Sequence, residues 1–151
     1  MRLAMQQALL AEEQGEVPVG AVLVDSRGEL LGTGFNRTIQ DQDPTGHAEI
    51  IALRAAATRM SNYRLPGASL FVTLEPCTMC MGAIMHARLS RVVFAAADPK
   101  TGACGSVINL PQEPRLNHHT EVVGGVLADE CGEMLRAFFR RRRGKEMNVE
   151  S

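Results

Sequence analysis

Two short segments of this 151-residue chain carry three potential metal ligands and one carboxylate. His47 and Glu49 are separated by one alanine, and Cys77 and Cys80 follow about thirty positions later. A structural zinc site closes with four protein ligands, whereas a catalytic site uses three and leaves a position for water. The residues therefore predict one Zn²⁺ ion bound by His47, Cys77 and Cys80. Glu49 is placed to take a proton from the water, which is hydrolytic chemistry.

Both segments are expected at the start of a helix. Thr45 is a candidate N-cap for a helix over residues 46–60, and Pro76 suits the first position of a helix over about 77–87. The backbone dipole at a helix N-terminus favours thiolates. His47 and Glu49, two positions apart, can converge only in a first helical turn. The sequence thus predicts a site built from two helix starts that face each other.

Other readings of the same residues are open. A C-x-x-C pair alone also occurs in redox dithiols and in structural zinc sites. A redox dithiol has no need of the upstream histidine and glutamate, and a four-cysteine site would need Cys104 and Cys131, which stand 27 positions apart. Glu49 could instead be a solvated charge on a helix surface. The open zinc site is preferred because it uses all four residues together.

The hydrophobic pattern predicts the elements that hold the site. Strand-type runs lie at residues 19–24, 30–35, 69–74, 91–96 and 121–124, and the first two are joined by turn residues. Helices are expected over 2–14, 46–60 and 77–87, and a final helix has an apolar stripe from Leu127 to Phe138. A strand, a helix and a strand form a parallel crossover. We expect a three-layer α/β/α fold, with a mixed five-stranded sheet and helices on both faces, in a single domain over residues 1–151.

Composition limits the class of protein. Hydrophobic residues make up 45% and charged residues 22%, which is ordinary for a globular domain. The chain has no stretch of membrane-spanning length and no signal-peptide pattern. Its four cysteines, two of them assigned to metal, indicate a reducing compartment. We therefore expect a cytoplasmic protein with no membrane contact.

Charge is distributed unevenly along the chain. The net charge is −1, yet residues 136–145 contain six basic and no acidic residues. A basic end on an acidic body predicts a polyanionic partner, and arginine suits phosphate and bases better than lysine. The alternative is that these cations only complement the dipole of the last helix and keep its end solvated.

The zinc pattern and its flanking blocks resemble the bacterial tRNA-specific adenosine deaminases, in the cytidine deaminase-like superfamily. The zinc pattern alone indicates only the superfamily. The blocks that point to the tRNA-acting branch span nearly the whole chain: residues 16–22, Asn36, 47–50, 62–65, 73–77, 100–103 and 138–140.

The resemblance implies roles for individual residues. His47, Cys77 and Cys80 would bind one Zn²⁺ per subunit, and Glu49 would shuttle protons while the wobble adenosine of a tRNA anticodon becomes inosine. The resemblance also implies an anticodon stem-loop as partner and a homodimer.

Three further residues would contact the RNA if this resemblance holds. Asn36 would contact base and ribose, or be a simple turn residue. Lys100 would lie near the RNA backbone. Phe139 would stack on a base, or pack in the protein beside Phe138.

Two rival functions remain open. One is a zinc deaminase of a free base or nucleoside, such as cytosine or guanine, which would share the catalytic residues. The other is a zinc-stabilised RNA-binding module without activity, in which Glu49 would have no catalytic role.

Overall fold

The structure is a computed structural model that describes the backbone of residues 1–150 and the side chains of residues 1–145; Ser151, in the predicted domain of residues 1–151, lies outside the described residues. The elements follow in the order α1 (Arg2–Glu13), β1 (Gly20–Val24), β2 (Leu30–Phe35), α2 (Ala48–Met60), β3 (Ser69–Leu74), α3 (Thr78–His86), β4 (Arg91–Ala96), a short 3-10 helix (Leu110–Gln112), β5 (Glu121–Val123) and α4 (Ala128–Glu150).

The five strands form one mixed sheet in the order β2-β1-β3-β4-β5, which confirms the predicted fold class. β1 pairs antiparallel with β2 and β3, while β4 runs parallel to β3 and β5. The β1–β2 hairpin closes through Asp25, whose carboxylate accepts the N–H groups of Arg27 and Glu29. Parallel pairing of β3 with β4 follows from the α3 crossover between them.

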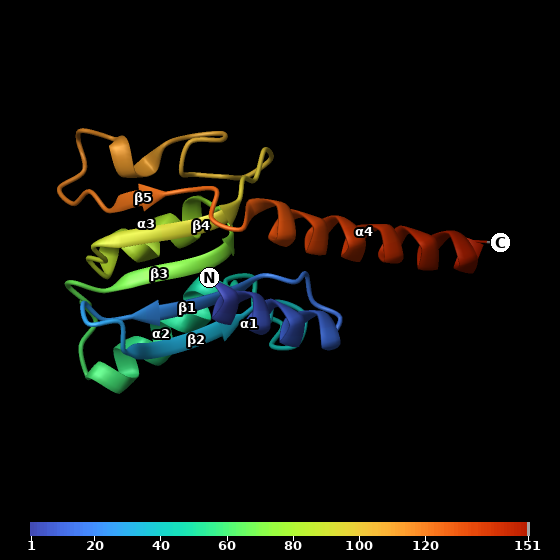
Figure 1. Cartoon of the computed structure of the whole chain (residues 1–151), viewed down its shortest axis with the longest axis horizontal. Helices are drawn as coiled ribbons and strands as arrows, with labels where there is room; N and C mark the ends of the chain where they lie inside the picture. Colours follow the sequence, from blue (N-terminus) through green and yellow to red (C-terminus); the bar gives the residue numbers. More distant parts are fainter. Residues whose placement is uncertain (151) are drawn as a thin grey trace.

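Helices cover both faces of the sheet, with α1 and α4 on one face and α2 and α3 on the other (Figure 1). Two glycines of β2 let α2 pack closely against the sheet. A Cβ on Gly34 would lie 2.4 Å from the Ala48 carbonyl oxygen, and one on Gly32 would lie 2.8 Å from that of Ala52. The close packing brings the first turn of α2 down onto the sheet, next to the carboxyl end of β3.

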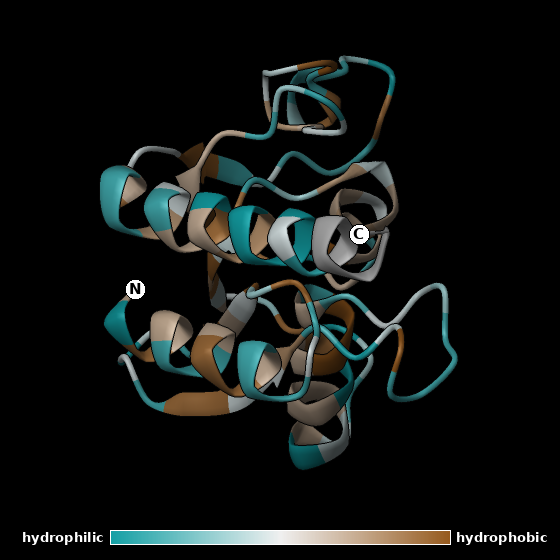
Figure 2. Ribbon diagram, turned by 90° about the vertical axis from the view of Figure 1, so that its right-hand side faces the viewer, coloured by the Kyte–Doolittle hydropathy of each residue, from teal (hydrophilic) through white to brown (hydrophobic). Residues whose placement is uncertain are grey.

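Helix α4 begins beside β4 and then extends past the edge of the body (Figure 1). Cys131 and Phe138 are buried, as the apolar stripe predicted. Leu127 precedes the helix, with φ of 58°. Figure 2 shows hydrophilic residues along much of α4, with apolar residues between them. In the part of the chain that the structure describes, no helix is long and apolar enough to cross a membrane.

Candidate active site

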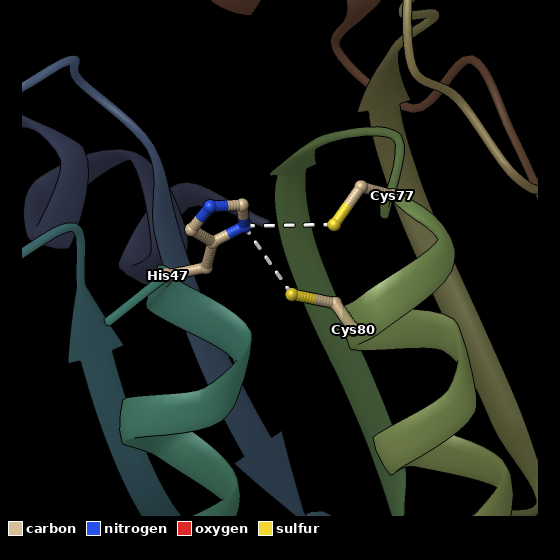
Figure 3. Close-up of side chains that lie close together, drawn as sticks. All are labelled: His47, Cys77 and Cys80. Carbon is tan, nitrogen blue, oxygen red and sulfur yellow. Dashed lines mark hydrogen bonds between the residues drawn. The ribbon is translucent and has the colours of Figure 1, made fainter. Parts of the chain in front are cut away.

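The three predicted metal ligands come together between the first turns of α2 and α3 (Figure 3). His47 is the residue before α2 and Cys77 the residue before α3, so each occupies an N-cap position. Cys80 lies on the first turn of α3 and is buried. Their ligand atoms all lie within 4.8 Å of one another, and no other residue in the described part of the chain joins this group.

The spacing of the ligand atoms fits zinc. The Nδ1 atom of His47 lies 3.6 Å from the Sγ of Cys77 and 3.5 Å from the Sγ of Cys80. A tetrahedral site with Zn–S of about 2.3 Å and Zn–N of about 2.0–2.1 Å separates nitrogen and sulfur by about 3.5 Å. One nitrogen and two sulfurs can hold a zinc ion at three vertices and leave the fourth for water.

The electrostatics of the group favour a thiolate at Cys77. The hydrogen bond with Cys80 lowers the pKa of Cys77 to about 4 against the opposing effect of burial, with further help from His47. The same contact and burial raise the pKa of Cys80 above its usual value. The hydrogen bond with Cys77 raises the pKa of His47. A thiolate therefore forms readily at the start of α3, where the N-terminal dipole also favours negative charge.

Glu49 lies in the first turn of α2 and is 4% exposed, which excludes a solvated surface charge. Burial raises the pKa of its carboxyl to about 7, opposed by a backbone hydrogen bond and by His47. Near neutral pH the group can therefore both accept and donate a proton, as a general acid–base catalyst must.

The predicted cap of α2 was wrong. Thr45 does not cap the helix, because its hydroxyl donates to the carboxylate of Asp43 at 2.7 Å. The side-chain oxygen of Asn36, which follows β2, instead accepts the N–H of Ala48 at 2.9 Å. The helix consequently starts at Ala48, two residues later than expected. Asn36 thus lies at the site and fixes the backbone between His47 and Glu49.

The predicted position of Pro76 was also wrong, because the first residue of α3 is Thr78. Pro76 precedes the N-cap Cys77 and is not the first residue of α3. Its carbonyl oxygen accepts the N–H of Ala103 at 2.8 Å, and Cys77 forms a bridge with Gly102. These contacts hold the turn before α3 extended, so the helix begins only at Thr78.

Lys100 and Phe139 are far apart in sequence but line one cavity of about 680 Å³, between the loop after β4 and α4. Phe138 is buried and Phe139 is 40% exposed, and their rings meet edge to face at 5.4 Å. Leu74 and Ala96, the last residues of β3 and β4, also line this cavity. The cavity therefore opens at the carboxyl ends of the strands.

Two buried carboxylates, Glu16 and Glu75, were not predicted from the sequence. Glu16 is 1% exposed and accepts the N–H groups of Ile39 and Gln40, in the loop between β2 and α2. Glu75 is 2% exposed and accepts four hydrogen bonds from the loop after β4. Each adjoins an apolar, strand-type run, and a carboxylate in such surroundings needs partners. A carboxylate beside an apolar run is therefore the sequence signal that could have identified Glu16 and Glu75 as buried.

The basic end of α4 is partly neutralised within the chain. Glu133 accepts hydrogen bonds from Arg136 at 3.2 Å and Arg140 at 2.7 Å, and Arg141 pairs with Glu12. All of these side chains are substantially exposed except that of Glu12. The pairs are therefore weak and can be exchanged for an external anion.

Comparison with known proteins identifies the family. Residues 1–96 match the family described as the cytidine and deoxycytidylate deaminase zinc-binding region. A tRNA-specific adenosine deaminase of Haemophilus influenzae is 53% identical over 150 residues, covering 99% of this chain and 86% of that protein. One from Bacillus subtilis strain 168 is 49% identical, covering 97% and 90% respectively.

A solved structure from a study of A-to-I editing by tRNA:A34 deaminases, at the wobble position of transfer RNA, superposes with a TM-score of 0.86. The two sequences are 44% identical, and the match covers 89% of this chain and 97% of the solved chain. The fold, the group of His47, Cys77 and Cys80 and the near full-length identity point to the same family. The chain therefore belongs to the tRNA-specific adenosine deaminase family of zinc-binding deaminases.

Proposed function

We propose that this protein converts adenosine to inosine at the wobble position of a tRNA anticodon, by zinc-dependent hydrolysis. The observation that carries the proposal is the three-ligand group His47, Cys77 and Cys80 with the buried Glu49 in the same helix turn. The relatives that match over nearly their full length supply the substrate class. Adenosine and water give inosine and ammonia, so a C–O bond forms at adenine C6 and the C–N bond to the exocyclic nitrogen breaks.

In this proposal His47, Cys77 and Cys80 hold the metal, and bound zinc supplies the Lewis acidity that makes water nucleophilic at neutral pH. Glu49 moves the protons. Its carboxylate takes a proton from the attacking water and delivers it to N1 of adenine. It then moves the proton of the new C6 hydroxyl to the exocyclic nitrogen, which leaves as ammonia as the C6 carbonyl forms. Its near-complete burial keeps bulk water from competing for those protons.

The side-chain amide of Asn36 supports the proposal, because its oxygen and its nitrogen can serve different partners. The side-chain oxygen is used by the N–H of Ala48. The amide nitrogen of Asn36 can then donate to the base or ribose of the nucleotide, because an amide has two donors to place. The same side chain would orient the substrate and the Glu49 turn.

Lys100 and Phe139 support an RNA contact at the cavity that they share. A second cavity of about 400 Å³ is lined by both residues together with Arg136, Arg140 and Arg143. Cations bind phosphates, and an exposed aromatic ring offers a face for a base, which is how proteins bind unpaired RNA. An anticodon loop supplies unpaired bases, so extrusion of the target base costs little.

The substrate assignment is tested by one panel of assays. Purified zinc-loaded protein is incubated with free adenosine, cytidine, guanine and an anticodon stem-loop that carries A at the wobble position. We expect ammonia release and inosine from the stem-loop alone. Turnover of a free base or nucleoside with none on RNA would reject the proposal in favour of a small-molecule deaminase.

The role of the basic segment is tested by salt dependence. Replacement of Arg140, Arg141, Arg142 and Arg143 with glutamine should weaken stem-loop binding. It should also flatten the plot of log affinity against log salt, because each phosphate contact releases counterions. An unchanged salt slope would assign these residues to helix solvation only.

A homodimer is proposed from the apolar surface between α2 and α3. A cavity of about 490 Å³ there is lined by Ile50, Leu53, Met79 and Ala83, and Tyr63 at its rim is 75% exposed. Tyrosine and methionine are enriched at protein interfaces. Light scattering should give a dimer mass for the natural protein and a lower mass for Tyr63→Asp. A matched charge on the other face of the sheet, Leu3→Asp, should leave the dimer intact, and a monomeric natural protein would overturn the proposal.

We also propose that the protein works in the cytoplasm, where a tRNA-modifying enzyme meets its substrate. Cell fractionation with antibody detection would test this, and recovery outside the cytoplasmic fraction would contradict it.

A further inference from the structure

Glu75 links the two strands that end at the site. It follows β3 and directly precedes Pro76 and Cys77, and its own N–H donates to the carbonyl oxygen of Ala96 at 2.8 Å. The main chain at Glu75 therefore continues the pairing of β3 with β4. Its side chain contacts the loop that follows β4, residues 98–106, which we call the clamped loop.

All four acceptor positions of the Glu75 carboxylate are used. Oε1 accepts the N–H of Asp98 at 3.1 Å and the hydroxyl of Ser106. Oε2 accepts the N–H of Cys104 at 2.9 Å and the N–H of Ser106 at 3.2 Å. Gly102 makes this approach possible, because a Cβ there would lie 2.3 Å from Oε2. A buried carboxylate with four donors is a strong tether.

The clamped loop connects two parts of the molecule. On one side it contacts the ligand turn, through the bridge between Gly102 and Cys77 and the bond from Ala103 to Pro76. On the other side it presents Lys100, in a turn that Asp98 closes by accepting the Lys100 N–H at 3.0 Å. One loop therefore joins a proposed zinc ligand to a proposed RNA contact.

We infer that Glu75 is a positioning residue that fixes Lys100 relative to Cys77. All four hydrogen bonds of its carboxylate go to the clamped loop, so it acts through the loop that it holds. The part of this inference that concerns RNA rests on the proposed function, whereas the part that concerns the loop and the ligand turn does not.

Glu75→Gln is the sharpest probe, because it keeps the shape of the side chain. It leaves one acceptor oxygen for four donors and turns an NH₂ group toward the others, so at least two donors lose their partner. Such losses are expected to raise loop opening by about 10- to 100-fold. Ser106→Ala removes only the hydrogen bond from the Ser106 hydroxyl to Glu75. Glu121→Gln, at an exposed position on β5, serves as the matched control.

The first measurement is amide hydrogen exchange on the zinc-loaded protein without RNA. Glu75→Gln should raise the exchange rates of the Asp98, Cys104 and Ser106 amides by about 10- to 100-fold. It should leave the exchange rates of the sheet amides unchanged. Zinc transfer to a chelator should become several-fold faster, because the Cys77 turn loses its support. Ser106→Ala should show a smaller effect at the same amides and remains informative if the glutamine variant does not fold.

The second measurement separates positioning from general stability. With the anticodon stem-loop, Glu75→Gln should raise KM by about tenfold and change kcat by less, because Lys100 contributes to binding. Unchanged loop exchange, or exchange raised equally throughout the sheet, would overturn the inference. So would an unchanged KM with a lowered melting temperature. If the natural protein makes no inosine in RNA, the proposed function fails. The exchange and zinc-transfer results still test whether Glu75 holds the clamped loop against the Cys77 turn.

Discussion

The substitution Glu49→Gln tests the catalytic proposal most selectively. Glutamine has nearly the size of glutamate, so the first turn of α2 and the cap from Asn36 should persist. It cannot accept a proton from water or return one to the substrate. Loss of general acid–base catalysis alone costs about 10²–10⁴-fold in rate. That range corresponds to about 3–5 kcal/mol of barrier.

The burial of Glu49 determines how large the loss of rate should be. Glu49 is 4% exposed and its carboxyl has a pKa of about 7 because of burial, so bulk water or an external buffer cannot readily replace it. We therefore expect a loss at the upper end of the range or beyond it. The ligand side chains of His47, Cys77 and Cys80 are unchanged, so zinc content should remain at one per chain.

The assay is single-turnover inosine formation in an anticodon stem-loop, with zinc content and RNA affinity measured on the same preparation. Glu121→Gln, an exposed carboxylate on β5, is the matched control and should keep the natural rate. A Glu49→Gln protein that retains more than a tenth of the natural rate would refute the proton-shuttle role. Loss of zinc from this variant would refute the division between ligands and base.

Three further perturbations have signs set by the structure. Gly34→Ala should destabilise the protein by about 1–3 kcal/mol in denaturant unfolding, because the added Cβ would lie 2.4 Å from a carbonyl oxygen of α2; a stability equal to that of the natural protein would contradict the packing. Glu133→Gln should tighten stem-loop binding several-fold at low salt, since it releases Arg136 and Arg140, and weaker binding would show that Glu133 itself orders the RNA-binding arginines. Burial raises the pKa of Cys104 to about 12, so its alkylation should be slow at pH 8 and rise about tenfold from pH 8 to pH 9. Rapid labelling at pH 8, detected by peptide mass spectrometry, would contradict this burial.

Local patterns predicted the sheet well. The runs that became β2, β3 and β4 were placed at their observed bounds, because polar or turn-forming residues begin just after each run ends. The ligand set was also accessible, since the types and spacing of His47, Cys77 and Cys80 specify an open zinc site. The structure brings these three together as expected.

Contacts between distant segments could not be predicted in the same way. Thr45 has the chemistry of a helix cap, but the nearer carboxylate of Asp43 takes its hydroxyl, and Asn36 reaches Ala48 from the end of β2. Whether Glu75 would be a surface charge or a buried tether depends on a loop that begins 23 residues later. Sequence spacing gives no distance between such segments until the sheet is assembled.

Position-resolved detection of inosine in bulk tRNA, with zinc measured on the same protein sample, tests the central claim most directly. We expect inosine at the wobble position and at no other adenosine, made by protein that carries one zinc per chain, and its loss when the metal is removed. Fully zinc-loaded protein that leaves every tRNA adenosine unchanged would contradict the account.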